Sequence, residues 1–172
     1  MSRARNVASL LTSADNINAS YMDSSSLPSG SVLQVKQTVI TAQYILGSSY
    51  ADVTGFSVDI TPNSTSSKIL IQVDLQGRID NGEGWGLRLY RGLTLIHDPT
   101  PDTGGPPYFV YNNGGATIHA SGAFSYLDSP SSTSTLTYKI QGRCRGSGIA
   151  KIVSDGTDNK GASSITVMEI AG

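Results

Sequence analysis

The chain has 172 residues and a formal net charge of −1, and 15% of its residues are charged. This length suits one well-buried domain and is too short for two once the irregular N-terminal segment is set aside. The charge balance excludes a basic surface that neutralises many phosphates, and no apolar run approaches the ~20 residues of a membrane span, so we expect neither a nucleic-acid partner nor membrane insertion.

The N-terminal segment predicts an arm rather than part of the domain. Apolar residues recur at helical spacing between residues 3 and 17, which indicates a short amphipathic helix that needs a partner surface to be stable. Residues 20–31 contain a run of turn formers and helix breakers, mostly Ser with one Pro and one Gly, and favour a linker. The segment lacks the apolar core of a signal peptide, so we expect assembly in a cytoplasm. We predict that residues 1–30 form a docking arm and linker, with a partner bound by Arg3, Arg5, Val7, Leu10 and Leu11.

Period-two alternation of apolar and polar residues starts near Ser31 and predicts a domain over residues 31–172. In the first expected strand, Leu33, Val35 and Val39 share one face. In the strongest one, Ile69, Ile71, Val73 and Leu75 point inward, and Leu70 adds an apolar residue to the outer face. The expected strands cover residues 33–39, 56–60, 68–75, 85–90, 93–96, 120–127, 136–145, 149–153 and 164–170.

Strands at this spacing, joined by turns rich in Gly and Ser, predict an all-β fold: a jelly-roll-like two-sheet β-sandwich with a short N-terminal helical or extended arm. Cys144 is the only cysteine, which excludes an intramolecular disulfide framework and a cysteine-rich metal site.

The last strand is apolar on both faces. Ile165 and Val167 share one face, and Met168 and Ile170 share the other. One face suits the domain's own core, and the other suits a neighbouring copy of the chain. We predict a subunit interface that contains Leu70, Met168 and Ile170.

Aromatic residues gather near a long loop between Asp98 and Gly115. Aromatic rings on glycine-rich loops stack on sugars or anchor protein interfaces, although core packing is expected to claim about half of them. The candidate receptor or glycan contacts are Trp85, Tyr108, Phe109 and Tyr111.

No motif predicts catalysis. His97 precedes Asp98, but neighbouring strand residues point to opposite faces, and we expect both histidines to be exposed loop residues. Asp80 and Glu83 are the only candidates for a glycosidase pair. The turn at residues 155–159 resembles a calcium loop in composition but lacks its spacing, so a hairpin turn is the better interpretation and a bound metal there stays open. We predict a protein that is not an enzyme, with no catalytic residues and no cofactor.

Five segments carry recognisable sequence signatures: Met1–Arg5, Gly30–Val35, Thr54–Leu70, Arg88–Gly92 and Ser164–Ile170. Together they resemble a β-rich module of virion appendages from marine and cyanobacterial bacteriophages. The resemblance covers nearly the whole chain and implies a trimeric sandwich that faces a receptor or decorates a capsid. The chain differs from typical long fibres because no repetitive shaft separates its arm from its domain.

The main functional hypothesis is therefore a virion structural protein: a homotrimeric tail fibre or receptor-binding appendage, docked by its arm on other tail or capsid proteins and assembled in the host cytoplasm. The first alternative is a capsid decoration protein, either a cement protein or a head fibre. The second is a carbohydrate-binding module, and a polysaccharide hydrolase comes third. The expected external partner is a host surface glycan or protein.

Overall fold

The computed structural model describes residues 27–99, 109–146, 149–153, 155–156 and 159–172. Within these ranges every regular element is a β-strand and every strand pair is antiparallel. None of the described residues forms a helix that is long and apolar enough to cross a membrane. The predicted helix of the arm lies outside the described residues.

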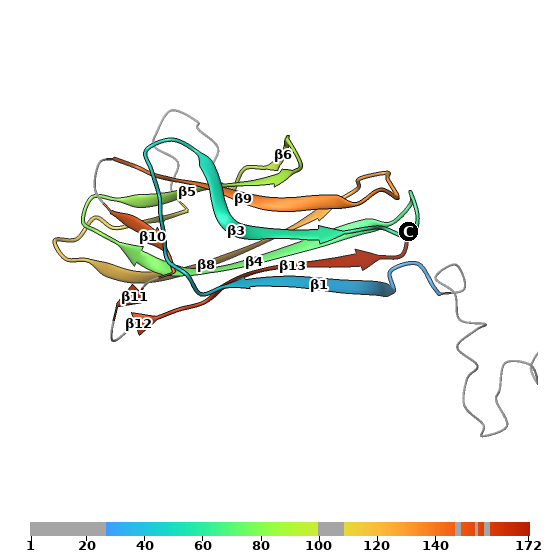
Figure 1. Cartoon of the computed structure of the whole chain (residues 1–172), viewed down its shortest axis with the longest axis horizontal. Coiled ribbons are helices and arrows are strands. Elements are labelled where there is room, and N and C mark those ends of the chain that lie inside the picture. The colour runs from blue at the N-terminus through green and yellow to red at the C-terminus, as the bar shows by residue number, and fades with distance from the viewer. Residues whose placement is uncertain (1–26, 100–108, 147–148, 154, 157–158) are drawn as a thin grey trace, which may run out of the picture.

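Two sheets face each other (Figure 1). The first sheet contains β1 (Val32–Ile40), β13 (Ser163–Ile170), β4 (Lys68–Ile79) and β8 (Ile118–Asp128), and β10 (Ala150–Ile152) and β2 (Tyr44–Ile45) extend it. The second contains β3 (Ala51–Ile60), β9 (Leu136–Cys144), β5 (Gly84–Arg91), β6 (Thr94–His97) and β7 (Val110–Tyr111). A small hairpin joins β11 (Asp155–Gly156) to β12 (Asn159–Lys160).

The order of the main strands is that of a jelly roll. It runs β1-β13-β4-β8 in one sheet and β3-β9-β5-β6 in the other, so the first and last strands pair and the chain crosses repeatedly between the sheets. The predicted jelly-roll-like two-sheet β-sandwich is therefore confirmed.

Alternating side chains fill the space between the sheets. On β4 the predicted inward residues Ile69, Ile71, Val73 and Leu75 are all buried, which confirms the strongest sequence pattern. The inward face of β13 and the facing strands of the second sheet complete the core with Ile165, Val167, Leu87, Leu89, Tyr138 and Ile140.

The first strand departs from its simple alternation. The pairing of β1 with β13 shifts between Val32 and Gln34, and this bulge places Gln34 opposite the buried Glu169. Val35 and Val39, which the sequence pattern put on the apolar face, consequently lie on the outside of the sheet and are each 53% exposed.

The start and the end of the domain lie side by side. The Gly30 amide donates to the Ala171 carbonyl at 2.8 Å, and the Ala171 amide donates to the Ser31 carbonyl at 2.8 Å. The first described residues therefore lie at the end of the sandwich that carries the C-terminal residue (Figure 1).

A buried carboxylate holds this end together. Glu169 on β13 is 0% exposed, and one of its oxygens accepts from the Asn63 amide and the Ser67 hydroxyl, each at 2.7 Å. The other oxygen accepts from the side-chain amides of Gln34 at 2.6 Å and Asn63 at 3.0 Å. The network ties β13 to β1 and to the turn that precedes β4, because a buried charge must find donors inside the protein.

Burial by itself would raise the pKa of the Glu169 carboxyl, but the hydrogen bonds from Gln34, Ser67 and Asn63 outweigh it and hold the pKa below its ordinary value. A carboxyl whose pKa is lower in the folded state than in the unfolded chain stabilises the fold at pH values above the unfolded pKa of about 4.3. That stabilisation is lost as the pH falls through the folded pKa.

We predict that Glu169→Gln lowers the free energy of unfolding at pH 7 by ~3 kcal/mol. The glutamine NH2 group would replace one accepting carboxylate oxygen, so that donors face a donor and lose their hydrogen bonds. Urea denaturation across pH 2–8 measures this, and the variant should also lose part of the acid dependence below pH 5. Asp74→Asn, which changes an exposed carboxylate on β4, is the matched control. Equal stability of the Glu169→Gln variant and the native protein at pH 7 would contradict the prediction.

Candidate functional site

Four apolar side chains form a row across the outer face of the first sheet. In the strand register, Val35 of β1 lies opposite Met168 of β13, Met168 lies opposite Leu70 of β4, and Leu70 lies opposite Leu127 of β8. Val35 is 53% exposed and Leu127 is 49% exposed, whereas Leu70 and Met168 are half-buried by their neighbours. Val32 and Ile170 form a second opposed pair beside the row. We call these residues the outer patch: Val32, Val35, Leu70, Leu127, Met168 and Ile170.

The outer patch has polar borders. The next row along the same face joins Gln37, Thr166, Gln72 and Ser125, and it includes a 2.8 Å hydrogen bond from Gln37 to Thr166. An exposed lysine, Lys68, lies opposite Ile170. An apolar patch with polar residues at its border is typical of a protein-binding surface.

The structure brings together the three residues that the sequence predicts for a subunit interface. Leu70, Met168 and Ile170 all lie on the outer face, and Leu70 and Met168 are direct cross-strand neighbours. Sequence reasoning missed Val35 and Leu127, since their position depends on the register of strands that are far apart in the chain.

The aromatic candidates for receptor contact do not form one surface. Trp85 is 0% exposed and belongs to the core, so its ring cannot stack on a glycan, and this part of the prediction is wrong. Phe109 packs edge-on against Phe124 with ring centroids 5.8 Å apart and occupies the space over Gly122. Tyr108 lies outside the described residues.

Tyr111 is the remaining aromatic candidate. Its hydroxyl accepts a hydrogen bond from Arg145 at 2.8 Å and donates to Asn113 at 3.3 Å, and the guanidinium carbon lies 5.2 Å from the ring centre. Tyr111 pairs with Gly84 at the start of β5, which follows the far end of β4. This places it at the end of the sandwich opposite Gly30 and Ala171.

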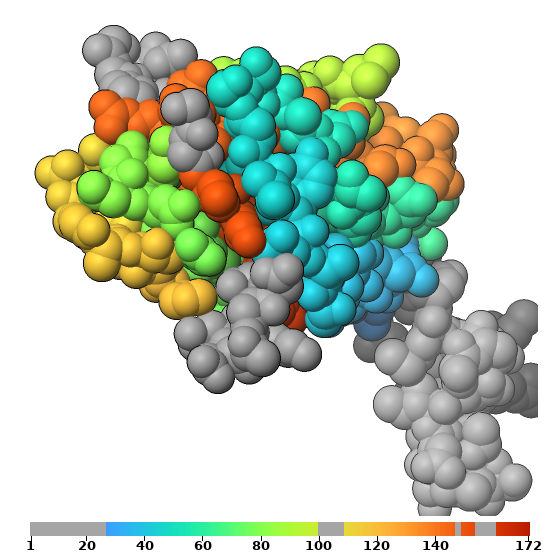
Figure 2. All heavy atoms as spheres, turned by 60° about the vertical axis from the view of Figure 1, so that its left-hand side comes forward, coloured from blue at the N-terminus to red at the C-terminus, as the bar shows by residue number. Residues whose placement is uncertain are grey.

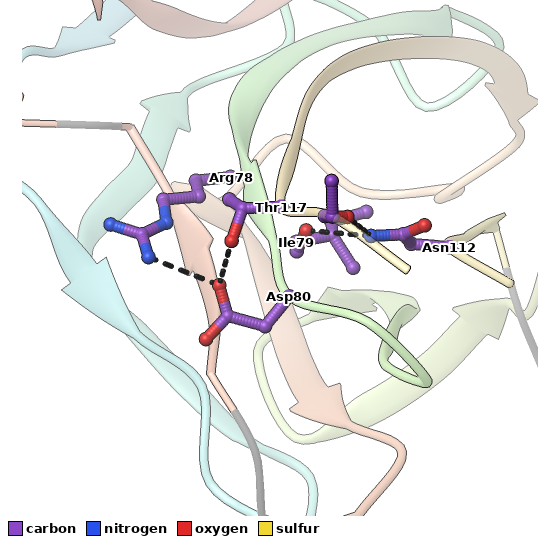
Figure 3. A network of polar contacts seen from close by, with 6 residues as sticks. Arg78, Ile79, Asp80, Asn112 and Thr117 are labelled. Atoms are coloured by element: carbon purple, nitrogen blue, oxygen red, sulfur yellow. Dashed lines mark hydrogen bonds and ion pairs between the residues drawn. The ribbon is translucent and has the colours of Figure 1, made fainter. Parts of the chain in front are cut away.

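Asp80 has a structural role. One of its oxygens accepts from Arg78 at 3.1 Å and from Thr117 at 3.0 Å (Figure 3). Beside it, the Asn112 side-chain amide donates to the carbonyls of Ile79 at 3.1 Å and of Ala116 at 2.7 Å. These contacts fasten the segment between β7 and β8 to the end of β4.

Glu83 is turned into the protein. Its carboxylate accepts from the Cys144 thiol at 2.8 Å and from the Gly146 amide at 2.8 Å, and Glu83 and Cys144 are both buried. The carboxylates of Asp80 and Glu83 are therefore tied into separate hydrogen-bond networks. Because Glu83 is also buried, the arrangement does not match a glycosidase pair, whose two carboxylates flank the same substrate bond.

Neither histidine lies in an exposed loop, which corrects the sequence expectation. His97 is half-buried on β6 and stacks on Tyr126 of β8 with ring centroids 4.8 Å apart, and His119 is exposed on β8. Among the described residues no three His, Cys, Asp or Glu side chains cluster closely enough to hold a metal ion. The predicted turn at residues 155–159 is a β11–β12 hairpin, part of which lies outside the described residues.

No model of a known protein family matches the chain, and no curated protein matches it significantly. Solved structures of similar fold come from infectious bursal disease virus. The VP2 subviral particle structure has a TM-score of 0.48 and 16% sequence identity, and the structure of the Gx strain has 0.46 and 15%. In both, the match covers 83% of this chain and 34% of the other, so the chain spans about a third of the length of the structures it matches.

The environment of Cys144 yields a chemical prediction. Burial, followed by the hydrogen bond to Glu83, raises the pKa of the Cys144 thiol to about 11. At pH 8 almost all of the thiol is therefore protonated. Because only the thiolate form is nucleophilic, Cys144 should be unreactive in the folded protein.

We predict that the folded protein does not react with a disulfide reagent over an hour at pH 8, whereas the chain unfolded in urea reacts at the rate of a free cysteine. Thr94→Cys, which adds an exposed thiol on β6, is the positive control, and rapid reaction of Cys144 in the folded protein would contradict the prediction.

Proposed function

We propose that the chain is a structural component of a virus particle that assembles as a homotrimer through the outer patch. The observation that carries this proposal is the apolar row from Val35 to Leu127 across four paired strands. Burial of exposed apolar surface stabilises an interface by about 25 cal/mol per Å². We choose a second copy of the chain as the partner because other copies are present wherever the protein is made.

The fold and the sequence support the same proposal. Jelly rolls of two sheets occur in viral capsid and lectin domains, which is an analogy at the level of fold. The resemblance of the strand and turn segments to phage virion appendages favours the viral alternative.

The arm is proposed as the docking element. It joins the domain at Leu27, and the next strand carries Val32 and Val35 of the outer patch. An arm that starts beside the subunit interface keeps the arms of an oligomer close to one another, so that several bind one site on the particle together. The proposed contacts are Arg3, Arg5, Val7, Leu10 and Leu11 on a tail or capsid protein.

In this arrangement the end of the sandwich with Tyr111 lies farthest from the arm and faces outward. An aromatic ring held by a guanidinium suits a host surface glycan, because the ring stacks on a sugar face and the cation binds acidic groups. This supports a receptor-binding tail appendage as the leading hypothesis. Capsid decoration is the alternative, and an image of the particle that locates the chain distinguishes the two.

We predict that Met168→Glu breaks the three-fold assembly, so that the mass in solution falls to one third. The change removes an apolar contact of about 2–3 kcal/mol and adds a charge, which raises the dissociation constant at least ~100-fold. Light scattering after size-exclusion chromatography measures the mass. Gln72→Glu adds the same charge on the same face in the polar row and should leave the mass unchanged. A native mass that is not a multiple of three chains, or a Met168→Glu variant of native mass, would overturn the trimer.

We predict that removal of residues 1–30 leaves a folded oligomer that no longer enters particles. The deletion ends before β1, so that the sandwich keeps all its strands. Particles assembled with the shortened chain are compared with native particles by quantitative mass spectrometry, and thermal unfolding checks the fold. Normal occupancy by the shortened chain would show that the arm has no docking role.

A further inference from the structure

The β8 strand is a long edge strand that lacks the usual protection against pairing. Its eleven residues pair with β4 from Ile118 to Asp128 without a register shift. Within the described residues, the backbone groups on its other side from Ala120 to Leu127 have no strand partner. In Figure 2 the gold-coloured segment that leads into β8 lies at the margin of the molecule.

Natural sheets protect their edges with charged residues, prolines, bulges or short strands. Between Ile118 and Leu127 the strand has none of these devices, because no Lys, Arg, Asp, Glu or Pro occurs there. The one charged residue of β8, Asp128 at its end, is buried and paired with Arg91. Its outward side chains between His119 and Leu127 are small: Ser121, Ala123 and Ser125.

The other edges in the described part of the structure are protected. β1 carries the exposed Lys36 and the bulge after Val32, and β3 carries a register shift between Asp52 and Ser57. The fourth edge is divided between the short strands β6 and β7. The contrast singles out β8 as the strand that remains open to pairing.

Neither face of β8 is fully covered in the described part of the structure. On the inner side Phe124 and Tyr126 are only partly buried, as expected of aromatic rings at an unpaired edge. On the outer side Gln72, Asp74, Ala123 and Ser125 line an open hollow of about 300 Å³.

We propose that β8 pairs antiparallel with β8 of a second copy across a two-fold axis, which joins the first sheets of two copies into one continuous sheet. The strand is self-complementary, since every register that overlaps residues 118–127 places uncharged side chains opposite uncharged ones. The same pairing between two β1 strands would bring Lys36 close to its own copy. A two-fold contact also covers the exposed edge of both partners, so that no free β8 edge remains and the contact yields a dimer, not a filament.

This contact is separate from the outer patch, which contributes only Leu127 to β8. The inference therefore does not depend on the proposed trimer. If both contacts form, two-fold and three-fold contacts on different surfaces connect the chains into larger symmetric assemblies.

Cysteine cross-linking of the full-length protein tests the pairing directly. Directly opposite residues of antiparallel strands have Cβ atoms about 4.5–5.5 Å apart, close to the distance that a disulfide spans. Ala123→Cys, Ser121→Cys and Ser125→Cys, each alone and mixed in pairs, sample the registers in which these outward positions lie opposite themselves or one another. We expect at least one of them to form a covalent dimer for most of the chain under mild oxidation, whereas Gln37→Cys on the outer face of β1 remains uncross-linked. Absence of dimer from all three, or equal cross-linking of Gln37→Cys, would overturn the proposal.

Charge variants provide the second measurement. In a Met168→Glu background, which removes the outer-patch contact, we expect a dimer, and the added pair Ser121→Lys and Ser125→Lys should raise its dissociation constant at least ~10-fold. Gln37→Lys adds a charge on β1, away from β8, and should leave the dimer intact. A Met168→Glu protein that is monomeric at 50 µM would contradict the β8 contact. A Met168→Glu protein of native mass would contradict the trimer. The two proposals can therefore fail independently of each other.

Discussion

The register of β13 between β1 and β4 is the constraint on which the rest of the structure depends. Because side chains alternate along a strand, a shift of one residue would exchange Ile165 and Val167 for Met168 and Ile170 on the inner face. Both sets are apolar, so hydrophobic burial alone discriminates weakly between the two registers. Glu169 resolves this ambiguity, because its carboxylate finds its donors only when β13 is aligned with Gln34 and the turn at Asn63. A polar network thus specifies the alignment that the apolar pattern leaves open.

Local pattern was sufficient for the fold class and for the strongest strands. β4 alternates so regularly that its inner face could be identified from the sequence, and the spacing of turns indicated a two-sheet sandwich. It was insufficient where tertiary contacts decide. The bulge in β1 exposes Val35 and Val39, Trp85 of β5 packs over Gly77 of the opposite sheet, and His97 is covered by Tyr126 of a strand that comes later in the chain. None of these partners is a sequence neighbour.

The same limit applies to the candidate site. Two residues of the outer patch on β13 and one on β4 could be predicted, because β13 is apolar on both faces and Leu70 interrupts the polar outer face of β4. Val35 and Leu127 could not, since only the pairing of β1 with β13 and of β4 with β8 aligns them with Met168 and Leu70. Asp80 and Glu83 show the converse: carboxylates that are close in sequence point into different networks, where they fasten turns.

The hydrogen bonds that join Gly30 and Ser31 to Ala171 have a mechanical consequence. A tensile load that enters the domain at Leu27 along the axis of β1 acts on a strand that is paired with β13 from Val32 to Ile40. Such a load shears the β1–β13 ladder, so that its hydrogen bonds resist together instead of opening one at a time. The end of the sandwich where the arm joins is therefore built to bear tension, which suits a module held at one end while its opposite end is pulled.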